Sequence, residues 1–236
     1  MRSTLLIVAS FLISTSVVLA DTAQERLNTA ANVFQQIMAT PDQGIPHDLL
    51  ARAQCVVIIP GMKKAGFVVG GEYGRGFAEC RQSNGTGWGA PAAVRMEGGS
   101  VGFQIGGSST DIVMLVMNRQ GMDRLLKDKV TLGADASIAA GPVGRTANAE
   151  TDAELHAEML AWSRSRGAFA GISLNGATLR PDRAVNAELY GKKMSNREIL
   201  TSNMTPPPAA QQLVSELDRY SARKGSGTAA RSTDNR

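Results

Sequence analysis

Residues 55–80 read CVVIIPGMKKAGFVVGGEYGRGFAEC, and this stretch decides the fold of the chain. It opens with a short apolar run, CVVIIP, whose length is typical of a buried strand. The following part is dense in glycine, and glycine inside strand-like segments marks bends, bulges or close approach of two backbones. The stretch therefore predicts two bent, neighbouring β-strands, with Lys63 and Lys64 in the turn between them.

The sequence on either side extends this pattern to a whole sheet. More than half of the 25 glycines lie between Gly61 and Gly107, among further strand-like segments such as WGAPAAVRM and SVGFQIGG. DIVMLVMN, from Asp111, adds another strand-like run. We predict a single α+β domain with a bent, glycine-rich antiparallel sheet, partly closed like a barrel and flanked by helices.

An amphipathic helix is predicted at residues 22–39, where Leu27, Phe34 and Met38 fall at helical spacing. Such a helix either packs on the domain or lies in a membrane interface. Its polar face carries few Lys or Arg residues, which interfacial helices usually show, and this favours packing on the domain.

Two capping boxes predict further helix starts. The segment TDAELHAEMLAWSRSRG pairs Thr151 with Glu154, and Met159 and Trp162 then share one helical face. We expect a long helix here. Ser195 begins a second capping box, in SNRE, and predicts a short helix in NREILT.

The two ends of the chain differ from the part between them. Residues 1–20 combine one basic residue, an apolar run and small residues before a cleavage point, which predicts a secretory signal peptide. An uncleaved signal anchor is the alternative. We expect a folded domain at 21–201 and a proline-broken, partly disordered tail at 202–236, which could bind an envelope protein. The mature protein is expected to be periplasmic or secreted.

Cys55 and Cys80 are the only cysteines. An even pair in an exported protein predicts a disulfide, and two buried free thiols are the alternative. Two cysteines and two histidines without ligand spacing predict neither a metal site nor a cofactor. The net charge of +4 favours anionic partners but is too small to indicate nucleic acid.

Two short motifs suggest enzymes. Gly71, Gly74 and Gly76 form GxxGxG, but a strand-like segment follows instead of the helix that a phosphate-binding loop needs. The other motif, GGSVG around Ser100, has the form of a nucleophile elbow, and His156 lies downstream in hydrolase order. Its glycine-broken, strand-like context argues against an elbow, so a serine hydrolase using Ser100 is the second hypothesis.

Six segments together resemble a known family. They are PGMKKAGFVVGGEYGRG, GWGAPAAV, GGSVGFQIGGSSTDIVMLVMN, LGADASIAAGPVGR, WSRSRGAFAGISLNGA and AELYGKKMSNREIL. In this order, over residues 21–201, they resemble the SYLF domain. The resemblance implies a non-catalytic lipid-binding module, associated with anionic lipid membranes and, in eukaryotes, with actin. We therefore expect an anionic phospholipid or membrane surface as partner, and peripheral membrane association.

Basic residues within these segments are the candidate head-group ligands: Lys63, Lys64, Arg75, Lys192 and Lys193. Each cation near an anionic surface contributes on the order of 1 kcal/mol, so a cluster of them binds weakly. The alternative is that they are ordinary solubilising surface residues.

Arg145, in GPVGR, is predicted to be structural, paired with a carboxylate such as Asp111 or Asp135. A head-group contact is the alternative for this arginine.

Overall fold

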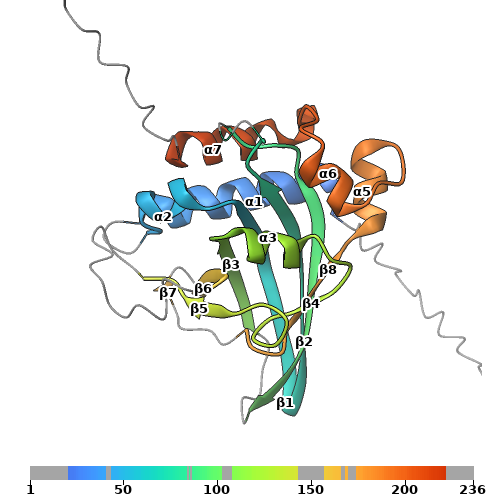
Figure 1. Cartoon of the computed structure of the whole chain (residues 1–236). Helices are drawn as coiled ribbons and strands as arrows, with labels where there is room; N and C mark the ends of the chain where they lie inside the picture. Colours follow the sequence, from blue (N-terminus) through green and yellow to red (C-terminus); the bar gives the residue numbers. More distant parts are fainter. Residues whose placement is uncertain are drawn as a thin grey trace, which may run out of the picture.

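The computed structural model in Figure 1 describes residues 21–40, 44–83, 85, 87–102, 108–142, 157–165, 168–169 and 174–221. The predicted signal peptide and the chain end beyond Ser221 lie outside these residues. The helices are α1 (Ala23–Met38), α2 (His47–Arg52), α3 (Arg119–Leu125), α5 (Arg183–Tyr190), α6 (Asn196–Thr201), the short 3-10 helix η1 (Pro208–Ala210) and α7 (Gln211–Ser221). The strands are β1 (Cys55–Cys80), β2 (Ala92–Gly102), β3 (Ser108–Val116), β4 (Val130–Thr131), β5 (Ile138–Ala140), β6 (Met159–Ser165), β7 (Ala168–Phe169) and β8 (Thr178–Pro181).

The strands form one curled sheet in the order β4-β8-β2-β1-β3-β6-β5, and β7 pairs with β6. The pairings are antiparallel apart from that of β5 with β6. Figure 1 shows α1, α2 and α7 together above the sheet, α3 in front of it, and β1 reaching to the bottom of the view. The predicted class, a single α+β domain with a partly barrel-like sheet and flanking helices, is confirmed.

β1 folds back on itself. Twenty-six residues in one extended strand would span roughly 86–94 Å, yet the Cα atoms of Cys55 and Cys80 lie 4.0 Å apart and a disulfide joins the two residues. Just outside the disulfide, the Arg81 N–H donates to the Gln54 carbonyl at 2.9 Å. The first arm of β1 pairs with β3 and the second arm with β2. The predicted pair of bent strands, closed by Cys55–Cys80, is thus confirmed.

The predicted turn at Lys63 and Lys64 is wrong. Both residues continue the ladder with β3. The proline-glycine pair before them makes a β-bulge instead, because β1 gains one residue relative to β3 between Ile59 and Met62. Gly61 has φ +54°, which a residue without a side chain adopts easily, so the strand kinks and carries on.

The glycines of the second arm of β1 allow its two arms to approach closely. A Cβ atom on Gly76 would lie 1.8 Å from the carbonyl oxygen of Ile58 in the first arm. Close backbone contact, rather than a phosphate ligand, therefore accounts for this glycine.

Side chains along the strands alternate between two cores, one on each face of the sheet. The helix-side core includes Leu27, Phe34, Ile37, Leu49, Val56, Ile58, Phe77, Val113, Leu115, Leu160, Trp162, Leu213 and Leu217. The inner core, inside the curl of the sheet, includes Cys55, Val57, Ile59, Met62, Cys80, Met96, Ile112, Met114, Val116, Leu125, Leu126, Met159, Leu179, Ile199 and Leu200. Each large side chain buried in this way contributes about 1.5–3 kcal/mol.

The predicted helix at 151–167 is wrong over residues 159–165, which form strand β6, while 151–156 lie outside the described residues. Met159 enters the inner core and Leu160 the helix-side core, so β6 is apolar on both faces. A strand buried on both faces shows no polar alternation, and its sequence is easily taken for a helix. Pairing with β3 and β5 decides in favour of the strand.

Helix α1 begins with a capping box between Thr22 and Glu25, and its apolar face is buried in the helix-side core. Packing on the domain, rather than lying in a membrane interface, is thus confirmed for this helix. After the proline-rich segment, α7 returns along α1 and buries Leu213 and Leu217 in the same core. The packed part of the domain therefore continues to Ser221. Within the described residues, no helix has both the length and the apolar character required to span a membrane.

Candidate functional site

Two of the predicted head-group ligands form ion pairs with buried carboxylates. Lys64 Nζ lies 2.9 Å from Glu72 Oε2, and Arg75 Nε lies 2.9 Å from Asp182 Oδ2. The side chains of Glu72 and Asp182 are only 5% and 3% exposed. Because a buried carboxylate without a partner is costly, both cations have a structural role, and a head-group role for them stays a prediction.

The other three predicted ligands are free to meet a ligand. Lys63 is exposed, and its Nζ lies 3.4 Å from Ser109 Oγ. Lys192 and Lys193 are both exposed in the loop between α5 and α6. Gly191, in the left-handed conformation with φ +66°, ends α5 and turns the chain into this loop.

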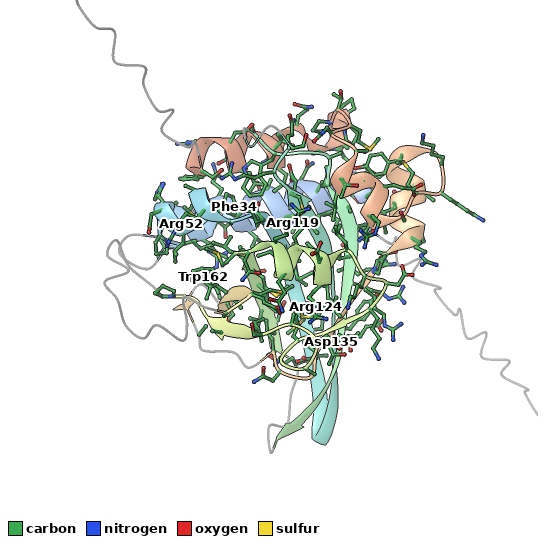
Figure 2. The ribbon with its side chains drawn as sticks, viewed as in Figure 1. Phe34, Arg52, Arg119, Arg124, Asp135 and Trp162 are labelled. Atoms are coloured by element: carbon green, nitrogen blue, oxygen red, sulfur yellow. A yellow bond between two sulfur atoms is a disulfide. The ribbon has the colours of Figure 1, made fainter. Side chains whose placement is uncertain are left out.

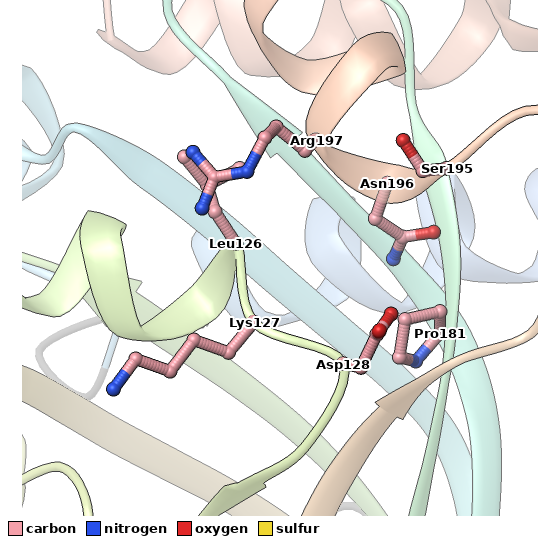
Figure 3. Close-up of a pocket in the computed structure, with 7 residues that line it drawn as sticks. All are labelled: Leu126, Lys127, Asp128, Pro181, Ser195, Asn196 and Arg197. Atoms are coloured by element: carbon pink, nitrogen blue, oxygen red, sulfur yellow. The ribbon is translucent and has the colours of Figure 1, made fainter.

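The start of α6 lies beside a cavity of about 350 Å³ (Figure 3). The cavity lies between the α3–β4 connection, the end of β8 and the first residues of α6. Its lining consists of Leu126, Lys127, Asp128, Pro181, Ser195, Asn196 and Arg197. In Figure 3, Arg197 and Lys127 lie above and below Leu126, with both charged ends pointing to the same side of the view.

The polar groups on the floor of this cavity are already hydrogen-bonded. The buried Asn196 accepts from Asn186 Nδ2 at 2.6 Å and donates to the Ala93 carbonyl at 3.1 Å. The hydroxyl of Ser195 donates to the Glu198 carboxylate at 2.8 Å. Hydrogen bonds from the backbone and the hydroxyl of Ser195 lower the pKa of Glu198.

The charges around the cavity divide into paired and unpaired groups. Asp128 Oδ1 accepts from Arg183 at 2.8 Å, which offsets its negative charge. Lys127 and Arg197 are both exposed, and within the described part of the chain neither of them forms an ion pair. The cavity therefore presents two available cations.

Lys127 and Arg197 were not predicted as ligands, because they lie far apart along the chain and in no motif that marks a binding site. The capping box at Ser195 correctly predicted the start of α6, with both reciprocal hydrogen bonds present. Nothing local indicates that the α3–β4 connection packs next to this helix. The useful signal is the neighbouring doublet of Lys192 and Lys193.

Arg145, predicted to be structural, lies outside the described residues. Asp111, one of the carboxylates considered for it, pairs instead with Arg164 across β3 and β6, with 3.3 Å between Arg164 Nη2 and Asp111 Oδ2. Asp111 Oδ1 also accepts from the Gly61 N–H at 2.9 Å, so this carboxylate holds the β1 bulge in place.

The position of Ser100 does not fit a serine hydrolase. Ser100 lies within β2 and is paired with Gly70 of β1, with residues 98–102 in continuous register. A nucleophile elbow needs a sharp turn from a strand into a helix, which a residue inside a paired strand does not provide. His156 lies outside the described residues. Among the described residues, no cluster of His, Cys, Asp and Glu could hold a metal ion.

One buried acid lies apart from the cavity. Glu79 of β1 is 1% exposed, and neither of its carboxylate oxygens has a hydrogen-bond partner. Burial, followed by the charge of Asp218 on α7, raises the pKa of Glu79 well above its usual value. Glu79 in turn contributes to the raised pKa of Tyr190, after burial. Glu79 is therefore a buried carboxyl group beneath the helix layer whose surroundings raise its pKa.

Comparison with known proteins identifies relatives of this domain. The family described as "Ysc84: Las17-binding protein actin regulator" matches residues 97–220, more than half of the chain. "LAS seventeen-binding protein 3" of Saccharomyces cerevisiae is 37% identical over 181 residues, covering 75% of this chain and 39% of the yeast protein. "SH3 domain-containing YSC84-like protein 1" of Homo sapiens is 31% identical over 181 residues, covering 76% of this chain and 52% of the human protein.

A third relative, "Protein YSC84" of Saccharomyces cerevisiae, is 35% identical over 180 residues, covering 75% of this chain and 38% of the yeast protein. The chain thus spans between about two fifths and half of the length of these three relatives. The match of the family over residues 97–220 includes every residue that lines the cavity, and it ends one residue before the end of α7. The chain therefore belongs to the Ysc84/SYLF domain family.

Proposed function

We propose that this domain binds anionic phospholipid, or another anionic amphiphile, at a membrane surface and catalyses no reaction. The observation that carries the proposal is a group of four exposed basic residues around α6, which we name the α6 basic face: Lys127, Lys192, Lys193 and Arg197. In the described part of the chain, none of the four forms an ion pair.

The members of the α6 basic face lie near one another. Lys127 and Arg197 line the same cavity. The charge of Lys192 helps to lower the pKa of Glu198, so Lys192 lies near the first turn of α6. Lys193 is its chain neighbour. The nearby acids have partners in the protein: Asp128 is paired with Arg183, and Glu198 is hydrogen-bonded to Ser195. Asp135, whose pKa the charge of Lys127 helps to lower, accepts from the Thr131 N–H.

The expected strength of such binding is modest. Four cations at about 1 kcal/mol each give about 4 kcal/mol, which corresponds to a dissociation constant on the order of 1 mM. The binding should weaken with added salt, because exposed charges are screened within about 10 Å at 0.1 M ionic strength. Lys63, also exposed, is proposed as an additional contact.

The descriptions of the relatives refer to Las17 binding and actin regulation, which are properties of those proteins. We favour a lipid for this chain because the accessible chemistry is positive charge beside a small cavity. The domain is further proposed to act in the periplasm or outside the cell, as a peripheral membrane protein. The N-terminal apolar run and the Cys55–Cys80 disulfide support this location.

Flotation with vesicles tests the proposal. The protein should float with phosphatidylcholine vesicles that contain phosphatidylglycerol, and not with phosphatidylcholine alone. Removing two of the four cations in K192A/K193A should weaken vesicle binding by about 30-fold, from about 1 kcal/mol for each lysine. Equal recovery with the two vesicle types, or no flotation with either, would contradict lipid binding.

A matched variant controls for net charge. R52A/R219A removes two exposed arginines from α2 and α7, whose side chains are 60% and 64% exposed. Arg52 lies at the opposite end of the helix layer from α5 and α6 (Figures 1 and 2). This variant should float like the wild type. If it loses as much binding as K192A/K193A, then net charge and not the α6 basic face is responsible.

A separate measurement tests the proposal that the domain catalyses no reaction. A fluorophosphonate probe reacts with activated serines, and it should leave the wild-type protein unlabelled. Labelling that disappears in S100A would contradict a purely binding role.

A further inference from the structure

We propose that the cavity between α3 and α6 binds a single phosphate group, with Lys127 and Arg197 as its ligands. This inference deepens the proposed function and rests on it for the source of the phosphate, namely the head group of an anionic phospholipid. A phosphate site would give the domain a defined contact with one head group, in addition to the general attraction between the α6 basic face and an anionic membrane.

The two cations lie on segments that meet at the cavity. Lys127 follows α3, Arg197 lies in the first turn of α6, and both line one cavity of about 350 Å³ (Figure 3). This volume is in the range of small-molecule sites. Long basic side chains on an open surface point in independent directions, whereas these two flank the same Leu126.

The chemistry of the two cations suits a phosphate group. A guanidinium offers a planar fork of donors that matches two phosphate oxygens, and an ammonium adds a point charge for a third. The other polar side chains of the lining are already hydrogen-bonded to the protein, as described for Ser195 and Asn196. The side chains of the lining therefore offer two charged donors, and the one carboxylate among them is that of Asp128.

The lining also contains a carboxylate, that of Asp128. A carboxylate in the lining would repel a phosphate, but Arg183 holds Asp128 at 2.8 Å from outside the cavity lining. We assign to Arg183 the positioning role of offsetting this charge. The pair is well exposed, with side chains 68% and 77% accessible, so it contributes little to the stability of the fold.

The lining also has an apolar part. Leu126 lies between the two cations, and Pro181 lies beside Asp128 (Figure 3). A phosphate that carries a glycerol backbone would place carbon atoms against these side chains, which free phosphate cannot do. A phospholipid head group should therefore bind more tightly than inorganic phosphate.

The experiment is a titration of the full chain followed by amide NMR, with two probes. One probe is inorganic phosphate, and the other is dihexanoyl phosphatidylglycerol below its micelle concentration. Both should shift amides at 126–128 and 195–197, and the lipid should bind more tightly. K127A/R197A should weaken binding of both probes by about 30-fold or more, since two charged hydrogen-bonding groups are lost.

Two further variants test the assigned roles. R183Q should weaken binding, because Asp128 then carries an unopposed charge, and D128N/R183Q should restore it. Lys127, Arg197 and Arg183 are exposed, so these variants should retain the melting temperature of the wild type. R52A/R219A, which alters neither a lining residue nor the α6 basic face, should bind both soluble probes like the wild type.

The outcomes separate the site from the function. If K127A/R197A binds both probes as the wild type does, or if neither probe shifts the lining amides, the phosphate site is overturned. If the soluble probes bind at the cavity while no vesicle floats, the lipid function fails and the phosphate site stands. Inorganic phosphate binding as tightly as the lipid would overturn the head group as the source.

Discussion

Cys55 and Cys80 join the two ends of β1, so one disulfide closes the hairpin at the centre of the sheet. The bridge closes a loop with a sequence separation of 25 residues. On the chain-entropy account, a loop of this length stabilises the fold by about 3.5 kcal/mol. C55A/C80A should therefore lose about 3.5 kcal/mol of unfolding free energy, measured by urea denaturation. An unchanged unfolding midpoint would show that the bridge contributes nothing.

The closeness of the two arms of β1 makes Gly76 intolerant of substitution. An added Cβ would meet the backbone oxygen of Ile58 at 1.8 Å, and backbone cannot move aside cheaply. G76A should cost about 3 kcal/mol or more. G99A in β2 is the matched control, because its Cβ would have nothing within 4 Å, and it should change stability by less than about 0.5 kcal/mol. Similar urea midpoints for the two variants would contradict the close approach.

The ion pair of Arg75 with Asp182 predicts a structural effect. R75A leaves a carboxylate that is 3% exposed without its cation, and the variant should lose about 1–3 kcal/mol of unfolding free energy. R75A/D182N removes the charge and should recover part of the loss, since an asparagine can still accept from the Val185 N–H at the start of α5. Vesicle flotation of R75A at a temperature where it is folded should equal that of the wild type. Weaker flotation with unchanged stability would instead make Arg75 a head-group ligand.

Glu79 predicts an unusual dependence of stability on pH. Burial raises its folded-state pKa above an unfolded value of about 4.3, so the stability it contributes is complete below that pH and is lost as the pH rises. E79Q cannot ionise. It should be more stable than the wild type at pH 8, and the difference should shrink toward pH 4. The charge of Asp218 from α7 raises the pKa of Glu79 further, and Glu79 in turn raises the pKa of Tyr190 from α5.

Glu25 provides a control, because its pKa is shifted in the opposite direction from that of Glu79. Hydrogen bonds from Thr22 lower the pKa of Glu25, so its contribution is present at neutral pH and is lost as the pH falls through that lowered value. E25Q should be less stable than the wild type at pH 7, with the deficit vanishing in acid. Thermal melts from pH 3 to 8 measure both variants. Parallel curves for E79Q and the wild type would contradict a raised pKa for Glu79.

Local patterns in the sequence were sufficient for much of the fold. Alternating apolar residues, dense glycine and two cysteines predicted the β1 hairpin, because strand period and backbone clearance are properties of the segment itself. The same holds for α1 and for the start of α6 at Ser195, where the capping groups lie within four residues of each other. Strand β6 could not be predicted from its local pattern. Its first four residues, 159–162, are apolar and buried, and only pairing with β3 and β5 distinguishes a buried strand from a helix here.

The candidate site was decided by tertiary structure. Lys192 and Lys193 were visible as a doublet, but nothing local connected them to Lys127. Leu126 and Ile199 of α6 both belong to the inner core, and the basic residues that follow Leu126 and precede Ile199, Lys127 and Arg197, line one cavity. Tertiary structure also separated Lys64 and Arg75 from the exposed lysines, by placing buried carboxylates next to them. The sequence by itself determined which charges the chain carries, and the packing of its apolar residues decided which of those charges remain available.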